Sequence, residues 1–398
     1  MAQLNSPSVV AVLPDKFGGA LNIVEGLFRH RRPDGFAYGV ILTHNPFGTG
    51  ARFVGRFSAD YQATFEFKTP VENLYAVVRR LHAAIPDGEG VLLANDLLEL
   101  AMASACDCGR AVVQILHADT DYYYDLAARH EDVIDAFVVY GRTMERRLKV
   151  RLPHRSNDIY FLPYGMPEPP RRRTAVSGKL RILFAGRLEH AQKGVLDLPV
   201  IDRILTDRGV DAQWTVVGGG PDEERLRGAW TSSRVSFLGT KEHEEVIDIA
   251  SEHDVFVLPT RWEGVPVALL EAMGVGLVPV VSHVESGVGE ILTDGVTGLM
   301  PPVGDTGAFA DAIVSLDTNR SKLETMSTAA SAYVRSNHDI RERTDAYQDL
   351  FARYQHLRRP RTRKGAIPYG SRLDQPWLPN TAVRTVRSVI RRAKGKPV

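Results

Sequence analysis

The sequence predicts an α/β protein built from two doubly wound domains, each with a mostly parallel sheet. Strand-like runs of β-branched and aliphatic residues alternate with helical stretches along most of the 398 residues. A stretch rich in proline and glycine at 163–178 interrupts this alternation and is the best candidate for a linker. We therefore expect an N-terminal domain over 1–170 and a C-terminal domain over 171–340, each large enough to bury its own core.

The first half starts with the apolar run Ser8–Pro14, which is typical of a buried parallel strand. The chain then breaks at Gly18 and Gly19, and the apolar periodicity that follows predicts a helix over 20–28. Further strands are expected at 38–42, 91–94, 111–116 and 134–140. The helices expected between them span 71–84, 96–105 and 142–150.

The second half repeats the alternation. Strands are expected at 180–185, 213–217, 235–238, 255–258 and 278–281. The helices expected between them span 194–207, 222–229, 242–250 and 266–274. An apolar stripe at helical spacing over 341–357 predicts a closing helix packed against the body. Ligands of doubly wound sheets bind beyond the carboxyl ends of the strands, so the loops after the strands are where chemistry is expected.

Cysteine content and hydropathy limit the class of protein. Only Cys106 and Cys108 occur, too few for a disulfide framework or a four-cysteine zinc site. No apolar run approaches the roughly 18 residues of a membrane span, and no signal-peptide core follows Met1. These features predict a cytoplasmic protein.

The net charge of +1 hides an uneven distribution. Residues 358–398 carry 12 Lys and Arg and a single acid, whereas the rest carries 37 basic and 47 acidic residues. Within this basic tail, apolar residues recur at helical spacing and arginines occupy another face of the same helix. This pattern suits peripheral contact with the anionic inner surface of a membrane. An arm that docks on the acidic body and a disordered extension remain open alternatives. No recognition motif accompanies the basic stretch, so nucleic acid is not expected as a partner.

Two cations follow the first strand of the second half. Arg187 comes directly after the strand, and Lys193 opens the next helix. A pair placed in this way can clamp a pyrophosphate, although two solvated surface cations would look the same. The turn Val216–Pro221 contains three glycines but lacks the dinucleotide-binding pattern. The glycines allow the backbone to approach a ligand closely, although a simple turn is the alternative.

The most specific feature is the pair Glu263 and Glu271, eight residues apart. Pro266 suits a first helical turn, which places Glu263 in the loop before a helix and Glu271 within it. The amides of Gly264, Val265 and Val267 near the helix start are candidates to hold phosphate oxygens while the two carboxylates bind hydroxyls. Two solvated helix charges are the simpler alternative.

His117 directly follows the strand at 111–116 in the first half. A histidine at a strand end can donate to a sugar hydroxyl or stabilise developing charge. A structural, hydrogen-bonded histidine is the alternative.

Together these stretches resemble the retaining glycosyltransferases of family 4, which have the GT-B fold of two Rossmann-like domains facing across a cleft. The resemblance is strongest over about 180–305 and rests on the order and spacing of several short motifs, including the EX7E motif Glu263–Glu271. In the first half the matching landmarks are Gly18-Gly19, His117 and Ile159–Gly165. Pro266 stands where the family often has a glycine, and this removes one possible phosphate donor.

The resemblance implies a role for each matching residue. Arg187 and Lys193 would neutralise the donor diphosphate, Glu263 would hold the transferred sugar, Glu271 would hold the ribose, and His117 would lie near the reacting sugar. The other donor-binding residues implied are Gly18, Gly19, Gly218, Thr240, Lys241, Gly264, Val265 and Val267.

The implied reaction retains configuration, with the acceptor attacking from the leaving-group face. Cationic side chains would take the place of a divalent metal, so no cofactor and no metal site are expected. The Asp119-Thr-Asp121 triplet fits the letters of a metal motif but lies in the first domain, away from the clamp.

The expected function is transfer of a hexosyl-type group from a nucleoside-diphosphate sugar to a saccharide, lipid-linked or small-molecule acceptor. A binding subunit that keeps the fold without transferase activity, and a nucleotide-sugar epimerase, are the alternatives.

Overall fold

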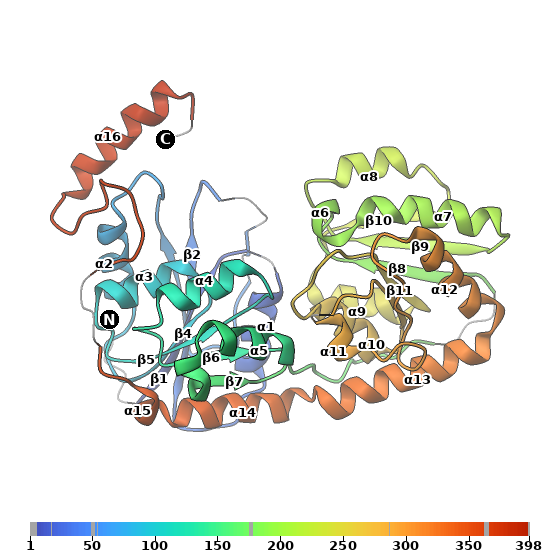
Figure 1. Ribbon diagram of the computed structural model, residues 1–398, viewed down its shortest axis with the longest axis horizontal. Coiled ribbons are helices and arrows are strands. Elements are labelled where there is room, and N and C mark those ends of the chain that lie inside the picture. The colour runs from blue at the N-terminus through green and yellow to red at the C-terminus, as the bar shows by residue number, and fades with distance from the viewer. Residues whose placement is uncertain are drawn as a thin grey trace. The chain divides into compact units, whose positions relative to one another are not determined.

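A computed structural model describes residues 6–16, 18–48, 52–53, 55–174, 178–285, 287–361 and 366–396. The chain forms two compact units (Figure 1). Unit 1 contains residues 1–140, 145–162 and 343–398, and unit 2 contains 141–144 and 163–342. The main change of unit thus falls between 162 and 163, where we expected it near 170. Parts of the expected linker and tail, 175–177 and 362–365, lie outside the described residues.

Unit 1 is built on a seven-stranded parallel sheet in the order β3-β2-β1-β4-β5-β6-β7. Its strands are β1 (Ser8–Pro14), β2 (Ala37–His44), β3 (Tyr61–Glu66), β4 (Gly90–Ala94), β5 (Ala111–Ile115), β6 (Ala136–Val139) and β7 (Ile159–Phe161). Its helices are α1 (Gly19–Arg29), α2 (Leu74–Ala84), α3 (Leu97–Ala105), α4 (Asp121–Arg129), α5 (Arg142–Arg151) and the 3-10 turn η1 (Pro153–Asp158).

The sequence did not predict the two edge strands β3 and β7. Strand β3 alternates partly buried and exposed residues along Tyr61–Glu66, and β7 spans only Ile159–Phe161. An edge strand buries less surface than a central strand, so it does not need the long apolar run that marked β1 and β4.

Unit 2 is built on a five-stranded sheet in the order β10-β9-β8-β11-β12. Its strands are β8 (Leu180–Ala185), β9 (Ala212–Val217), β10 (Val235–Gly239), β11 (Val255–Leu258) and β12 (Val278–Val281). Its helical elements are α6 (His190–Lys193), η2 (Val195–Asp197), α7 (Leu198–Asp207), α8 (Glu223–Ala229), α9 (His243–Ser251), α10 (Val267–Val275), α11 (Val288–Ile291), α12 (Thr306–Thr318) and α13 (Arg320–Asn337).

The helix predicted over 194–207 is confirmed as α7 over Leu198–Asp207, but its predicted start is wrong, because α6 ends at Lys193 and the 3-10 turn η2 separates it from α7. Gly194 causes the break: its φ of 63° is left-handed, and a Cβ there would lie 2.0 Å from the Pro259 carbonyl oxygen. The close approach brings the loop after β8 against the end of β11.

Both sheets place a topological switch beside their first strand. In unit 1 the order reverses between β1 and β4, and in unit 2 between β8 and β11. The loops at the carboxyl ends of these strands therefore form the edge where ligands bind in doubly wound sheets. Nine of the sequence-predicted site residues lie in loops at the carboxyl edges of the two sheets, namely Gly18, His117, Arg187, Gly218, Thr240, Lys241, Glu263, Gly264 and Val265.

The chain returns to unit 1 at its C-terminal end. Helix α14 (Ile340–Ala352) buries Tyr347, Leu350 and Phe351, as the apolar stripe predicted, and the short helix α15 (Tyr354–Leu357) follows it. The predicted continuous helix over 341–357 is therefore divided at Arg353.

The described part of the basic tail docks on unit 1. An ion pair joins Arg361 Nη2 to Asp135 Oδ2 at 2.9 Å, and Asp135 is 1% exposed. Asn73, at the start of α2, donates its side-chain amide to the Gln375 and Leu378 carbonyl oxygens at 2.9 and 2.8 Å. The final helix α16 (Asn380–Ala393) packs through Val383, which is 1% exposed, and through Arg387, which pairs with Asp374 at 2.7 Å. Of the three possibilities for the tail, the described residues show docking.

Candidate functional site

The centre of the candidate site in unit 2 is an ion pair between Lys193 and Glu263. Lys193 ends α6 after β8, and Glu263 lies in the loop between β11 and α10. Lys193 Nζ lies 2.6 Å from Glu263 Oε1, and the Thr260 hydroxyl donates to the same oxygen at 2.8 Å. Glu263 is 5% exposed and Thr260 is 0% exposed. The two donors occupy Oε1, so a ligand hydroxyl is left with Oε2 as its acceptor.

The sequence predicted a role for each of the two residues but did not predict the contact between them. Lys193 was expected at the diphosphate and Glu263 at the sugar, yet the two side chains are in direct contact. Thr260, which holds Glu263, was not predicted at all. The only sequence signal was its position one residue after Pro259, at the end of a strand.

Arg187 is placed differently from Lys193. Its side chain is 62% exposed and pairs with Glu189, with Nε 3.3 Å from Oε2. The two predicted clamp cations therefore share the loops after β8 but pair with different carboxylates.

The glycine turn after β9 is a point of close packing between loops. Gly218 has a φ of 131°, and a Cβ there would lie 1.9 Å from the Gly186 carbonyl oxygen. A Cβ on Gly220 would lie 2.4 Å from the Leu188 carbonyl oxygen. A Cβ on Gly219 would lie 3.0 Å from Thr240 Oγ1, in the loop after β10. Glycine is therefore required here to bring the loops after β8, β9 and β10 together, whatever they bind.

The predicted residues at the base-binding turn also have partners. Lys241 pairs with Glu245 in the first turn of α9, with Nζ 3.2 Å from Oε1. The start of α9 also places His243 beside Glu271, with 3.2 Å between Nδ1 and Oε1. Glu271 lies within α10, as the sequence predicted, and is 9% exposed. The contact with His243 was not predicted from the sequence.

The start of α10 keeps the predicted amides available. Within the described residues, the backbone N–H groups of Gly264, Val265 and Val267 donate to no acceptor. Pro266 precedes the helix as its N-cap and has no N–H. A Cβ on Gly287, in the loop after β12, would lie 1.5 Å from the Gly264 carbonyl oxygen, so the two loops are in close contact.

Unit 1 carries Gly18, Gly19 and His117 at the carboxyl edge of its own sheet. Gly18 is the N-cap of α1, and a Cβ there would meet no atom within 4 Å, so it faces open space. His117 lies after β5, with Nε2 2.8 Å from Asn95 Oδ1. Burial lowers the pKa of His117 to about 3, so its ring is neutral near pH 7. The sequence did not predict Asn95, although it directly follows a strand.

Asp119, in the triplet that fits the letters of a metal motif, has protein partners. Asp119 Oδ1 pairs with Arg147 Nη1 at 2.5 Å and also accepts a bond from Tyr124. Over the whole described part of the chain, no group of three or more His, Cys, Asp or Glu side chains is placed to hold a metal ion. In the same residues no helix is both long and apolar enough to cross a bilayer.

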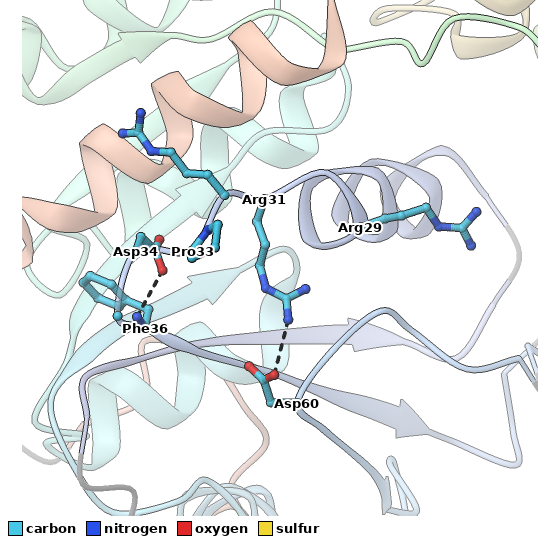
Figure 2. A pocket seen from close by; sticks show the side chains of 8 residues that line it. Arg29, Arg31, Pro33, Asp34, Phe36 and Asp60 are labelled. Atoms are coloured by element: carbon cyan, nitrogen blue, oxygen red, sulfur yellow. Dashed lines mark hydrogen bonds and ion pairs between the residues drawn. The ribbon is translucent and has the colours of Figure 1, made fainter.

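A pocket of about 470 Å³ lies elsewhere in unit 1, in the loop between α1 and β2 (Figure 2). Its arginines already have partners: Arg31 pairs with Asp60 at 3.3 Å, and Arg32 pairs with Asp349 at 2.6 Å. Because this loop precedes β2, the pocket is at the amino edge of the sheet, opposite the edge that carries the candidate site residues.

Comparison with known proteins agrees with this geometry. Residues 179–319 match the family model described as Glycosyl transferases group 1. The amylovoran biosynthesis glycosyltransferase AmsK of Erwinia amylovora is 36% identical over 172 residues, 41% of this chain and 42% of the relative. The alpha-D-kanosaminyltransferase of Streptomyces kanamyceticus is 35% identical over 150 residues, 37% of this chain and 38% of the relative. The matches thus span about two fifths of the length of these relatives.

Solved structures match over both units. Anabaena HepE, crystallised with UDP and glucose, has a TM-score of 0.70 at 16% identity over 87% of this chain and 99% of its own. Sucrose-phosphate synthase from Thermosynechococcus elongatus has a TM-score of 0.67 with the same identity and coverage. The chain therefore has the GT-B fold, as the motif resemblance predicted, and its residues 179–319 match the glycosyl transferases group 1 family model.

Proposed function

We propose that this protein is a glycosyltransferase that moves a sugar from a nucleoside-diphosphate sugar to an acceptor hydroxyl in polysaccharide or glycolipid synthesis. The observation that carries the proposal is the ion pair of Lys193 with the buried Glu263 at the carboxyl edge of the unit 2 sheet, within the segment that matches the family model. The relatives named above are glycosyltransferases, and one of them acts in amylovoran biosynthesis.

The chemistry is the breaking of a sugar–phosphate bond with departure of a diphosphate. A fixed ammonium and free backbone amides at the start of α10 stabilise charge that grows on the departing phosphate. Removing one such donor typically lowers kcat by about 10² to 10³. Glu263 positions a sugar hydroxyl through Oε2, the carboxylate oxygen that Lys193 and Thr260 leave available.

We further propose retention of configuration and catalysis without a divalent metal. Both follow from the family resemblance and from cationic side chains at the site. The anomeric configuration of the product, read by NMR, tests the first, and full activity after exhaustive dialysis against EDTA tests the second.

The first experiment is a thermal-shift screen of the full chain against uridine, guanosine and adenosine diphosphates and their sugars. A ligand at 100 times its Kd stabilises the folded state by about 2.7 kcal/mol, which is easily detected. HepE was crystallised with UDP and glucose, so uridine diphosphate sugars are tested first.

The second experiment measures donor consumption with a panel of acceptors. Glu263→Gln, Lys193→Met and Arg187→Ala should each reduce turnover at least tenfold. Lys179→Met removes an exposed cation of the same unit that pairs with Asp211 at 3.3 Å, so it serves as the matched control. Donor binding without turnover on any acceptor would indicate a binding subunit instead, and donor isomerisation without acceptor would indicate an epimerase.

We also propose that α16 brings the protein to an anionic membrane surface. Its exposed apolar residues Val386, Val389 and Ile390 are 45%, 62% and 45% exposed, and Trp377 just before the helix is 74% exposed. Exposed cations accompany this row, namely Arg384, Arg392, Lys394 and Lys396. A helix with such an exposed apolar row and a basic polar face is typical of helices that lie in the interface of anionic bilayers.

The docking of the tail determines how this proposal is tested. A chain that ends at Leu357 would also lose the buried Arg361–Asp135 pair, so truncation would disturb unit 1 itself. The double variant Val389→Asp, Ile390→Asp changes only exposed positions of α16. Val150→Asp, at an 83% exposed valine of α5, is the matched control.

We expect the wild type and the control to sediment with vesicles of phosphatidylglycerol and phosphatidylcholine but not with phosphatidylcholine alone. The α16 double variant should lose this binding. Equal sedimentation of all three proteins would contradict the proposal, and a wild-type dimer that the double variant abolishes would assign the apolar row to self-association.

A further inference from the structure

Asn95 is held at the carboxyl end of β4 by bonds that fix the orientation of its side chain. It is 2% exposed, and its amide nitrogen donates to the Val12 and Leu93 carbonyl oxygens at 3.0 and 3.1 Å. Its backbone N–H donates to Glu99 Oε1 at 2.5 Å. Because only an NH₂ group can donate to two carbonyls, the position of Oδ1 follows from these contacts.

That oxygen determines where His117 carries its proton. Asn95 Oδ1 lies 2.8 Å from His117 Nε2. An amide oxygen only accepts, so Nε2 must carry the hydrogen, and in a neutral imidazole Nδ1 is then an acceptor. The lowered pKa of His117 agrees with a neutral ring.

His117 Nδ1 is left without a partner. It is buried and makes no hydrogen bond to any described residue. The rings of Tyr123 and Tyr140 flank the imidazole, with centroids 6.1 and 5.9 Å away. A buried acceptor without a donor is uncommon in proteins, because it has lost its bond to water. At the ligand-binding edge of a doubly wound sheet, an incoming group that carries a hydrogen would satisfy it.

We propose that Asn95 is a positioning residue that holds His117 as the Nε2–H tautomer, so that Nδ1 accepts a hydrogen bond from a hydroxyl of the bound sugar or acceptor. The inference rests on the proposed function for the identity of the ligand. It reverses the direction expected from the sequence, in which His117 donates. In this tautomer Nδ1 carries no hydrogen and Nε2–H is bonded to Asn95, so His117 has no proton to give to the departing diphosphate.

The tautomer itself is tested without any activity. Full-length protein labelled with ¹⁵N-histidine gives two-bond ¹H–¹⁵N correlations whose patterns differ between tautomers, and the His117 signals are those missing from His117→Gln. We expect the Nε2–H pattern from pH 5 to 8 in the wild type. An Nδ1–H tautomer or an imidazolium in this range would overturn the proposal. This result does not depend on whether the protein is a transferase.

The Asn95→Ala variant tests the cause. We expect the His117 signals to move toward a mixture of tautomers, whereas Asn319→Ala, which removes the N-cap bond of α13 in unit 2, should leave them unchanged. An unaltered His117 pattern in a folded Asn95→Ala protein would show that Asn95 does not position the ring.

The ligand is tested with analogues in which one hydroxyl is replaced by hydrogen or fluorine, made separately for the donor sugar and for the acceptor. For the hydroxyl that reaches Nδ1, kcat/KM should fall at least tenfold in the wild type, with fluorine as poor as hydrogen because it cannot donate. The same replacement should change kcat/KM less than twofold in His117→Ala. If a donor analogue shows this loss, the hydroxyl belongs to the donor sugar, and if an acceptor analogue shows it, the hydroxyl belongs to the acceptor. If every analogue lowers kcat/KM equally in the wild type and in His117→Ala, Nδ1 does not accept a hydrogen bond from a ligand hydroxyl.

Discussion

A double-mutant cycle on Lys193 and Glu263 tests whether their contact is a working pair in the free protein. The two side chains are 17% and 5% exposed, with 2.6 Å between Nζ and Oε1. At an effective dielectric constant near 20 the attraction is about 6 kcal/mol, most of which is offset by desolvation. Breaking a fully buried pair costs about 3–5 kcal/mol and breaking an exposed pair about 0–1 kcal/mol. We therefore expect Lys193→Met to lower the free energy of unfolding of unit 2 by about 2–3 kcal/mol.

Glu263→Gln alone should cost a similar amount, and the double variant should cost much less than the sum. The coupling energy expected is about 2 kcal/mol. Three of the four tryptophans, Trp214, Trp230 and Trp262, belong to unit 2, so their fluorescence follows guanidinium unfolding of this unit.

The exposed pair of Arg227 and Glu223 in α8 provides the matched control cycle. It lies in the same unit with 2.9 Å between Nη2 and Oε1, but its side chains are 45% and 30% exposed. Its coupling should not exceed about 0.5 kcal/mol. If the Lys193–Glu263 cycle is additive within about 0.5 kcal/mol, the reasoning is refuted and the two residues contribute to stability independently.

Three further predictions concern the scaffold of the site. Gly218→Ala should destabilise unit 2 by about 1–3 kcal/mol and abolish the nucleotide thermal shift, because the new Cβ meets the Gly186 carbonyl; an unchanged shift would contradict this. Asp202→Ala should lower the free energy of unfolding by about 3–5 kcal/mol. Asp202 is 4% exposed, accepts hydrogen bonds from the Trp214 and Trp230 indoles at 2.9 Å each, and pairs with Arg234. A loss below about 1 kcal/mol would argue against a stabilising role of this network. Burial lowers the pKa of His130 from 6.5 to about 4, so only the unfolded state binds its proton between these values. Stability of unit 1 should fall with falling pH in this window by up to about 1.4 kcal/mol per unit from this group, and His130→Gln should flatten that slope in urea unfolding at pH 5–7.

Much of the fold was predictable because buried parallel strands need continuous apolar runs. The runs at Ser8–Pro14 and 180–185 coincide with β1 and β8. The edge strands β3 and β7 were not predicted, because a strand with a single neighbouring strand does not need a continuous apolar run. The turn at Gly194 was not predicted for a different reason. The Pro259 carbonyl oxygen, which requires glycine at this position, is 65 residues away in the sequence and adjacent only in the folded unit.

Some residues of the candidate site could likewise be predicted from the sequence, and others could not. The residues that the motifs supply, such as Glu263, Lys193 and His117, were predicted, because a ligand-binding edge requires particular side chains at the ends of strands. The residues that orient them, Thr260 and Asn95, were not, because a buried hydroxyl or amide next to a strand has no pattern that distinguishes it from a structural one.

By itself, the sequence determined the two α/β domains, the loops in which a ligand site is expected and the concentration of positive charge after residue 357. Periodicity and motif spacing are local properties of the chain, and these features depend on nothing else. Only the tertiary structure decided which charges are paired. In the folded chain Lys193 pairs with Glu263 and Arg187 pairs with Glu189, and the Arg361–Asp135 ion pair holds the tail on unit 1. Electrostatic interactions depend on distance in space, and that distance is set by packing between segments far apart in the chain.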